Sequence, residues 1–287
     1  MAKNRKKKRS FKRSIKRSLQ RFKKSFKKTV SKLKEKVLIH KRLKNKYDIK
    51  DVPIDKEENK GTLESSGFVD YHYQRLDNIS NFLSKISSKL EHVYINDDLT
   101  IEYDIKTHKI YSLNSSLDNF KNKLNENKDK HFVAVTFNVQ LITFSHANVI
   151  LIDNKNKNIE FFEPHGHKDD DSTLEGVKGA YFQKARHLKK FMKDILPDYN
   201  FKNVSEMFKQ EGFQMKYDAR HGYCVTWSIL YVHYRLLNPD IKLDILVQYI
   251  YYYITRNKLL RYAKYIEKIL KRQINLITFK GNIILNN

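Results

Sequence analysis

Three side chains in the second half of the chain are of the types that nucleophilic catalysis requires. They are His146, Glu163 and Cys224, and Cys224 is the only cysteine among the 287 residues. A thiolate attacks a carbonyl carbon, an imidazole takes the thiol proton, and a carboxylate orients the imidazole. Because these residues are far apart in the sequence, this chemistry depends on the elements that position them.

Two apolar runs, "HANVILIDN" (146–154) and "NIEFFEP" (158–164), are typical of strands, and the polar segment "NKNKN" predicts a hairpin turn between them. Antiparallel pairing around this turn places His146 opposite a position near residue 166, just past Glu163. A diagonal neighbour on a sheet is within reach of a long side chain. We therefore expect Glu163 to contact the imidazole, fix its tautomer and raise its basicity.

The segment "HGYCVTWS" (221–228) opens a predicted helix that continues to about Leu237. A helix N-terminus and a nearby imidazolium both favour a thiolate, which makes Cys224 a candidate nucleophile. Gly222 permits close backbone approach and unusual dihedral angles at the turn into the helix. The first N–H groups of a helix have no partner within it and can serve an oxyanion. The pattern predicts a Cys–His acyl-transfer site.

Each of these residues alone has an ordinary structural interpretation. A lone cysteine is most often a small buried hydrophobe, His146 suits a cap or the edge of a core, and Glu163 suits a solvated strand end. Their combination favours a catalytic site over three separate structural roles. Trp227, one helical turn after Cys224, is expected to pack beneath the site.

Other polar groups give no reason to expect a metal or a cofactor. His165, His167 and the acids at 169–171 occupy a polar stretch without a cysteine, which favours a solvated loop over a metal site. The chain contains no phosphate-binding glycine loop and no dinucleotide fingerprint. We expect no bound metal and no cofactor.

Two segments together carry a family resemblance. The stretch "SHANVILIDNKNKNIEFFEPHG" (145–166), followed by "GYCVTWSILYVHYRLLNPD" (222–240), resembles the adenain-like and ubiquitin-like-protein-specific cysteine peptidases. Within this family, the two segments look most similar to the versions carried by large DNA viruses. The likeness covers roughly residues 130–240, and "FEPHG" is its most specific local match.

The resemblance implies an α+β papain-like cysteine-protease fold. In that family a catalytic histidine begins a strand, an acid lies on the next strand, and the nucleophilic cysteine heads a buried helix. These roles fall on His146, Glu163 and Cys224. The chain would then be a cysteine-type peptidase, a hydrolase that cleaves viral precursor proteins or ubiquitin-like conjugates.

The chain departs from the family pattern at two places. The position after the histidine is often tryptophan in the family and is Ala147 here. The family usually has an oxyanion-hole glutamine six or seven residues before the cysteine, where this chain has Asp218 and Tyr217. The nearest glutamine is Gln214, and a longer loop, "MKYDARH", would deliver it to the site. Gln214 is therefore the candidate oxyanion donor.

Two other functions remain open from the sequence. One is acyl transfer to an amine, since some bacterial effector acetyltransferases use a similar His–acid–Cys set on a related fold. The other is an inactive protease fold retained as a basic virion or nucleic-acid-binding protein. A polypeptide substrate is the expected partner of the active form.

The positive charge is concentrated in residues 1–46. This segment holds 22 Lys and Arg against a single acid, Glu35, for a net charge of +21. The whole chain has a net charge of +25, so residues 47–287 carry only +4. The high isoelectric point is therefore a property of this basic arm, and the rest of the chain is close to balanced.

The arm also has an apolar stripe at helical spacing, which predicts a basic amphipathic helix. Such a helix suits an anionic membrane surface, nucleic-acid phosphates or an acidic groove on a partner. A solvated tail that orders only on contact is the alternative, since like charges repel along the helix. The stripe consists of Phe11, Ile15, Leu19, Phe22, Phe26, Val30, Leu33 and Val37.

Residues 47–66 are polar and aperiodic and read as a linker, so we expect the catalytic domain to cover residues 67–287. Strands flanked by helices on both sequence sides predict an α+β domain. The predicted helices cover 75–93, 115–126 opened by a serine cap, 176–196 and Cys224 to about Leu237, and after a break at "NPD" one or two tyrosine-rich helices fill the rest. The predicted strands cover 99–105 and 108–113, which are expected to form a hairpin, and 131–142, 146–154, 158–164 and 199–204.

The sequence also restricts the compartment. The longest dense apolar run, residues 245–254, is too short to span a membrane, and the N-terminus lacks a signal-peptide core. A single cysteine allows no intramolecular disulfide, which favours a reducing compartment. We expect an intracellular protein without a transmembrane segment, in a virion or in the host cytoplasm or nucleus.

Overall fold

The computed structural model describes residues 38–54, 77–88, 90–140, 145–166, 180–207, 212–214 and 223–284, without the side chains of 180–182 and 272–284. The chain divides into two compact units, Met1–Ile49 and Lys50–Asn287. Residues 38–47 of the first unit form a helix, and the rest of the predicted arm helix lies outside the described residues. The strands and the candidate catalytic residues belong to the second unit.

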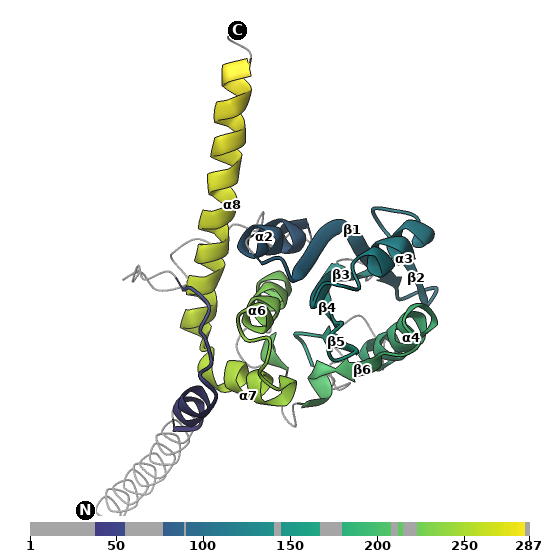
Figure 1. The fold of residues 1–287 in the computed structure, drawn as a ribbon, viewed down its shortest axis with the longest axis horizontal. Coiled ribbons are helices and arrows are strands. Elements are labelled where there is room, and N and C mark those ends of the chain that lie inside the picture. The colour runs from purple at the N-terminus through teal and green to yellow at the C-terminus, as the bar shows by residue number, and fades with distance from the viewer. Residues whose placement is uncertain are drawn as a thin grey trace, which may run out of the picture. The chain divides into compact units, whose positions relative to one another are not determined.

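A curled mixed sheet of strands in the order β2-β1-β3-β4-β5-β6 is the framework of the second unit (Figure 1). The β1–β3 and β5–β6 pairs are parallel, and the remaining neighbours are antiparallel. The strands are β1 (Val93–Asp104), β2 (Lys109–Ser112), β3 (Phe132–Gln140), β4 (Ser145–Asp153), β5 (Asn158–Phe162) and β6 (Asn200–Asn203).

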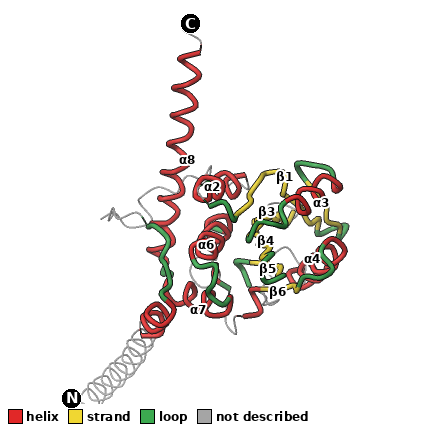
Figure 2. Tube along the Cα trace, viewed as in Figure 1, coloured by secondary structure: helices red, strands yellow, loops and turns green. Residues whose placement is uncertain are grey.

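Helices cover both faces of the sheet, so the predicted α+β class is confirmed (Figure 2). On one face, α6 (Cys224–Leu237) packs against β4 and is flanked by α2 (Asp77–Ser87) and α8 (Arg256–Ile284). On the other face lie α3 (Leu117–Glu126) and α4 (Ala180–Ile195). The short helix η2 (Val204–Met207) and α7 (Leu243–Tyr253) complete the described elements. Within the described residues, no helix is both apolar enough and long enough to cross a membrane.

Strand alternation assigns the side chains of β4 and β5 to these two faces. Ile150 and Ile152 belong to one hydrophobic core with Leu188 of α4. On the opposite face, Phe162 stacks on Tyr231 of α6 with ring centroids 4.4 Å apart. Because both faces are buried, residues 149–152 of β4 form a continuous apolar run, and the polar side chains of these strands are largely buried as well.

Helix α6 is the central helix of the second unit. Its residues from Val225 to Leu236 are buried, because the sheet, α2 and α8 surround it. A helix that is apolar on nearly every side is typical of such a position. Cys224, its first residue, therefore begins a helix that is held from several directions.

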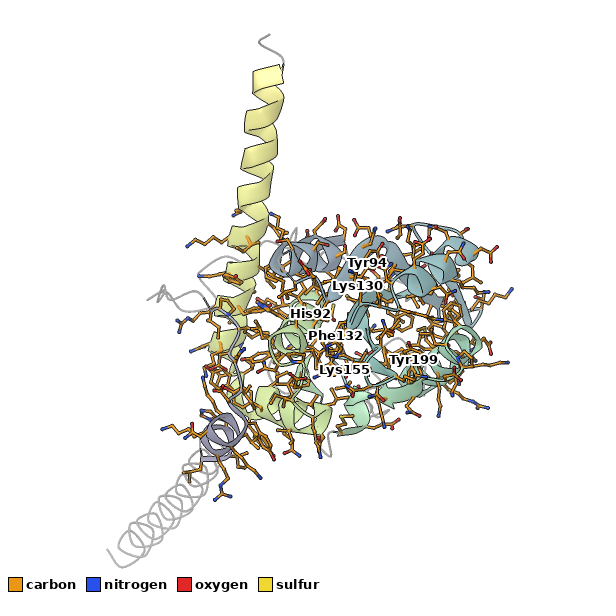
Figure 3. All side chains as sticks on the ribbon, viewed as in Figure 1. His92, Tyr94, Lys130, Phe132, Lys155 and Tyr199 are labelled. Atoms are coloured by element: carbon orange, nitrogen blue, oxygen red, sulfur yellow. The ribbon has the colours of Figure 1, made fainter. Side chains whose placement is uncertain are left out.

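A buried ion cluster joins the far end of α6 to the sheet. Arg235 donates to both carboxylate oxygens of Glu160, at 3.0 Å and 2.9 Å, and Tyr231 donates to the same carboxylate at 2.6 Å. The guanidinium also lies 3.4 Å from Asp153 and over the ring of Phe132, one of the side chains labelled at this end of the sheet in Figure 3. These contacts fix the tilt of α6 on β4 and β5.

The second unit begins with a segment attached to the end of α6. The side-chain amide of Asn238 accepts from the backbone N–H of Lys50 at 2.7 Å and donates to its carbonyl at 2.9 Å. Asp51 accepts from the hydroxyl of Tyr249 at 2.5 Å. Lys50 and Asp51, which the sequence assigned to a linker, thus contact the end of α6 and α7. The predicted boundaries after residues 46 and 66 stay predictions, and the second lies outside the described residues.

Several local predictions are confirmed. The β1–β2 hairpin forms, and Ser116 caps α3 by accepting from the backbone N–H of Asn119 at 3.1 Å. The predicted helix over 75–93 was too long, because α2 ends at Ser87 and Val93 already begins β1. A register irregularity between Ile95 and Thr100 interrupts the pairing with β3, which explains why the first part of β1 lacks a regular strand pattern.

Candidate active site

His146 and Glu163 are in contact, as the hairpin predicted. His146 is the second residue of β4 and is buried, and its Nε2 lies 2.6 Å from Oε1 of Glu163. The register differs from the predicted one by a single position, since Val149 pairs with Phe162. Because Nε2 faces the carboxylate, Nδ1 is the ring nitrogen suited to exchange a proton with a thiol.

A tight turn after β5 holds the Glu163 side chain in place. The backbone N–H of Gly166 donates to the carbonyl of Glu163 at 3.2 Å, and Gly166 has a φ of 89°, which glycine adopts without strain. The backbone N–H of His165 donates to Oε1 of Glu163 at 2.9 Å. The ring of His165 meets the ring of His146 edge-on, with centroids 4.4 Å apart. This geometry gives "FEPHG" a physical role as the support of the imidazole.

Gln214 lies against the same turn. Its backbone N–H donates to the carbonyl of Pro164 at 2.8 Å, and its side chain is buried. Its Oε1 has no hydrogen-bond partner among the described residues. Gly212 makes the approach possible, because a Cβ at that position would lie 2.0 Å from the carbonyl oxygen of His165. The candidate oxyanion donor is thus beside Glu163 and has an unsatisfied amide oxygen.

Aromatic packing joins the segments that carry the candidate residues. Phe213, which precedes Gln214, contacts Phe162 of β5 with ring centroids 5.4 Å apart and Trp227 of α6 at 5.0 Å. All three rings are fully buried. The expected core packing of Trp227 is confirmed. Because the cluster touches β5, the 212–214 segment and the first turn of α6, it sets their relative positions.

Cys224 is the first residue of α6 and is half-buried. The partial positive charge of a helix N-terminus favours a thiolate at this position. Burial lowers the pKa of Lys184 on α4, and the charge of Cys224 opposes this shift, so the thiol interacts electrostatically with that lysine. Gly222, which the sequence placed before this turn, lies outside the described residues.

Lys184 was not among the predicted residues. It belongs to α4, is 1% exposed, and its Nζ contacts Oε2 of Glu163, the oxygen that His146 does not use. One signal in the sequence does mark it. Lys184 precedes Leu188 and Met192 at steps of four, on the face of α4 that packs into the core. A lysine on that apolar face requires a buried partner.

The site therefore collects one imidazole, one carboxylate, one ammonium and one thiol. Burial lowers the pKa of His146 well below its ordinary value, and the charge of Lys184 adds to the effect. Burial also lowers the pKa of Lys184 well below its ordinary value, and the charge of Cys224 opposes this. A low imidazole pKa means that His146 is a neutral base near pH 7.

The structure places the His146 imidazole and the Lys184 ammonium group on the two oxygens of Glu163, and the backbone of Gln214 lies against the turn that follows this carboxylate. Among the described residues, no group of three or more His, Cys, Asp or Glu side chains is placed to hold a metal ion. The stretch with His167 and the acids 169–171 lies outside those residues. The chain matches no protein-family model and no curated protein.

Proposed function

We propose that this protein is a cysteine endopeptidase with a papain-like fold and a His–Glu–Cys triad. The observation that carries the proposal is the buried contact between His146 and Glu163, in a cluster that also interacts electrostatically with Cys224. The resemblance of residues 145–166 and 222–240 to adenain-like and ubiquitin-like-protein-specific peptidases supports the same reaction. It suggests viral precursor proteins or ubiquitin-like conjugates as substrates.

The residues would act as follows. The Cys224 thiol passes its proton to Nδ1 of His146, and Sγ bonds to the scissile carbonyl carbon. Glu163 holds the ring through Nε2 and stabilises the imidazolium that forms. The oxyanion accepts hydrogen bonds from the backbone N–H of Cys224 and from the side-chain amide of Gln214. The amine leaves with the proton from His146, and a thioester remains on Sγ.

Water completes the reaction. His146 takes a proton from the water molecule as its oxygen attacks the thioester carbon, the C–S bond breaks, and the carboxylic acid leaves. The low pKa of His146 suits both steps, because a neutral imidazole can accept a proton each time. The buried position of the imidazole also keeps bulk water away from its Glu163 contact.

The test uses full-length protein and a library of peptides with mass-spectrometric detection of products. Wild type should cleave peptide bonds, and Cys224→Ala should leave no cleavage above background while its circular dichroism is unchanged. Glu163→Gln should retain more activity, because it disturbs the orientation of the imidazole and leaves the nucleophile in place. Cleavage by Cys224→Ala at the wild-type rate would contradict the proposal.

Two further measurements separate the other functions. A hydrolase incorporates ¹⁸O from labelled water into the new carboxylate, whereas an acyltransferase transfers the acyl group to an added amine. An inactive protease fold gives neither product, and its Cys224 reacts with iodoacetamide no faster than free cysteine does. Gln214→Ala should lower kcat by about 10²–10³ with little change in KM, the cost of one oxyanion donor.

A further inference from the structure

Lys184 brings a second kind of charge into the candidate active site. Its ammonium group contacts the Glu163 oxygen that is turned away from His146, and its side chain is 2% exposed. Burying an ammonium group costs several kcal/mol unless it is paired. An apolar side chain at this position of α4 would fill the same space without this cost.

The charged and titratable groups around Lys184 come from several elements. Glu163, after β5, contacts its Nζ directly, and the charge of Lys184 acts on the imidazole of His146 on β4. Cys224, at the start of α6, interacts with it electrostatically. On α4 itself, the next turn carries His187, which contacts the hydroxyl of Tyr103 at 3.3 Å. The His165 ring also faces this cluster through its contact with His146.

We propose that Lys184 is a positioning residue for the proposed reaction, a fixed buried cation that holds Glu163 in place and favours the thiolate of Cys224. The inference rests on the function proposed above. It assigns to α4 a role in catalysis that neither the triad pattern nor the oxyanion donor includes. Burial disfavours the charged form of Lys184, whereas the Glu163 carboxylate in contact with its Nζ and the charge of Cys224 favour it.

The charge of Lys184 should shift the pH profile of the reaction in one predictable direction. The thiol and the imidazole lose two protons in two coupled steps. Each loss makes the site more negative, so a fixed positive charge nearby favours both steps and moves both to lower pH. Removing this charge must therefore move both limbs of the pH profile of kcat/KM to higher pH. A charge within about 4–6 Å changes a pKa by about 1–3 units.

The experiment compares Lys184→Gln, Lys184→Arg and the control Lys189→Gln in the full-length protein. Gln donates a hydrogen bond to Glu163 without a charge, Arg keeps the charge, and Lys189 is an exposed lysine on the same helix. Alkylation of Cys224 by iodoacetamide, followed against pH, reports thiolate formation without any substrate. Hydrolysis of a cleaved library peptide gives kcat/KM over the same range. Circular dichroism and thermal melting report folding.

We expect both limbs of Lys184→Gln to move up by about one pH unit or more, with wild-type limbs for Lys184→Arg and Lys189→Gln. A Lys184→Gln variant that is folded and less active, with unmoved limbs, would show a purely structural lysine and overturn the inference. If Lys184→Gln does not fold, the wild type decides. At a pH above the upper limb of the wild-type profile, the rates of Cys224 alkylation by anionic iodoacetate and by neutral iodoacetamide are compared. A positive charge on Lys184 makes the ratio of these two rates higher than for free cysteine. A ratio equal to that of free cysteine refutes the inference.

These outcomes separate the inference from the proposed function. A wild-type thiol that alkylates like free cysteine, together with no peptide cleavage, contradicts the proposed function itself. A reactive thiol and a working peptidase whose limbs do not depend on Lys184 contradict only the role of the lysine.

Discussion

Protonation of His233 should destabilise the fold at low pH, and the loss of unfolding free energy can be calculated. It lies on α6, is 5% exposed, and its Nδ1 is 2.9 Å from the hydroxyl of Tyr262 on α8. The ring of Phe82 on α2 meets it edge-on. Burial lowers the pKa of His233 from an ordinary value of 6.5 to about 4. Protonation would place a charge between three packed helices.

The direction of this pH effect follows from proton binding by the unfolded and the folded protein. The unfolded chain binds a proton near pH 6.5, whereas the folded protein resists it until about pH 4. The stabilisation from neutral His233 is therefore complete above pH 6.5 and is lost as the pH falls toward 4. The difference between these two pKa values corresponds to about 3 kcal/mol of unfolding free energy.

Urea unfolding of wild type and His233→Gln at pH 7 and pH 4 measures this quantity. Between the two pH values wild type should lose about 3 kcal/mol more than the variant does. Tyr262→Phe is the matched control, because it removes the hydrogen bond and keeps the titrating ring, so its loss should follow wild type. Equal losses for wild type and His233→Gln would refute the reasoning.

Three further predictions concern the site, the ion cluster and the arm. Gly212→Ala should lower the melting temperature and reduce kcat by about 10²-fold, because the backbone must move on the order of 1 Å from His165; unchanged melting and kcat would contradict this. Arg235→Ala should cost about 3–5 kcal/mol of unfolding free energy by leaving Glu160 buried and unpaired, whereas replacing both with Met should cost less; urea unfolding of both variants decides. Removing residues 1–46 should abolish most binding to DNA, with an affinity that falls steeply with salt in the full-length protein, and leave peptide hydrolysis nearly unchanged. Anionic vesicles test the apolar stripe, since only vesicle binding should be lost when these residues become serine: Phe11, Phe22 and Phe26.

The sequence predicted the elements whose signals are local. Apolar runs on both sides of a polar turn were sufficient to place His146 near Glu163, because the hairpin register follows from the turn. The start of α6 at Cys224 was likewise visible, since a glycine and a long apolar run mark it. The one-position register difference did not affect the contact, because a long carboxylate side chain reaches a diagonal neighbour.

The remaining features depend on contacts between distant segments. Lys184 reads as one more exposed lysine in a helix rich in them until its face is compared with Leu188 and Met192. Gly212 has no local signal, because its role is to let one backbone pass close to another at His165. The parallel pairing of β1 with β3 was hidden by the irregular register near Thr100. Such long-range relations are set by the packed core as a whole.

The paired hydrogen bonds between Lys50 and the Asn238 amide have a mechanical consequence. Any tension on the arm enters the second unit through the peptide bond before Lys50, and these bonds pass it first to Asn238, the residue that follows α6. Cys224 begins the same helix. A force of this kind would therefore act on α6, the helix that begins with Cys224. The contacts of Arg235 with Glu160 and Asp153 would resist it, because they hold the end of α6 to β5 and β4.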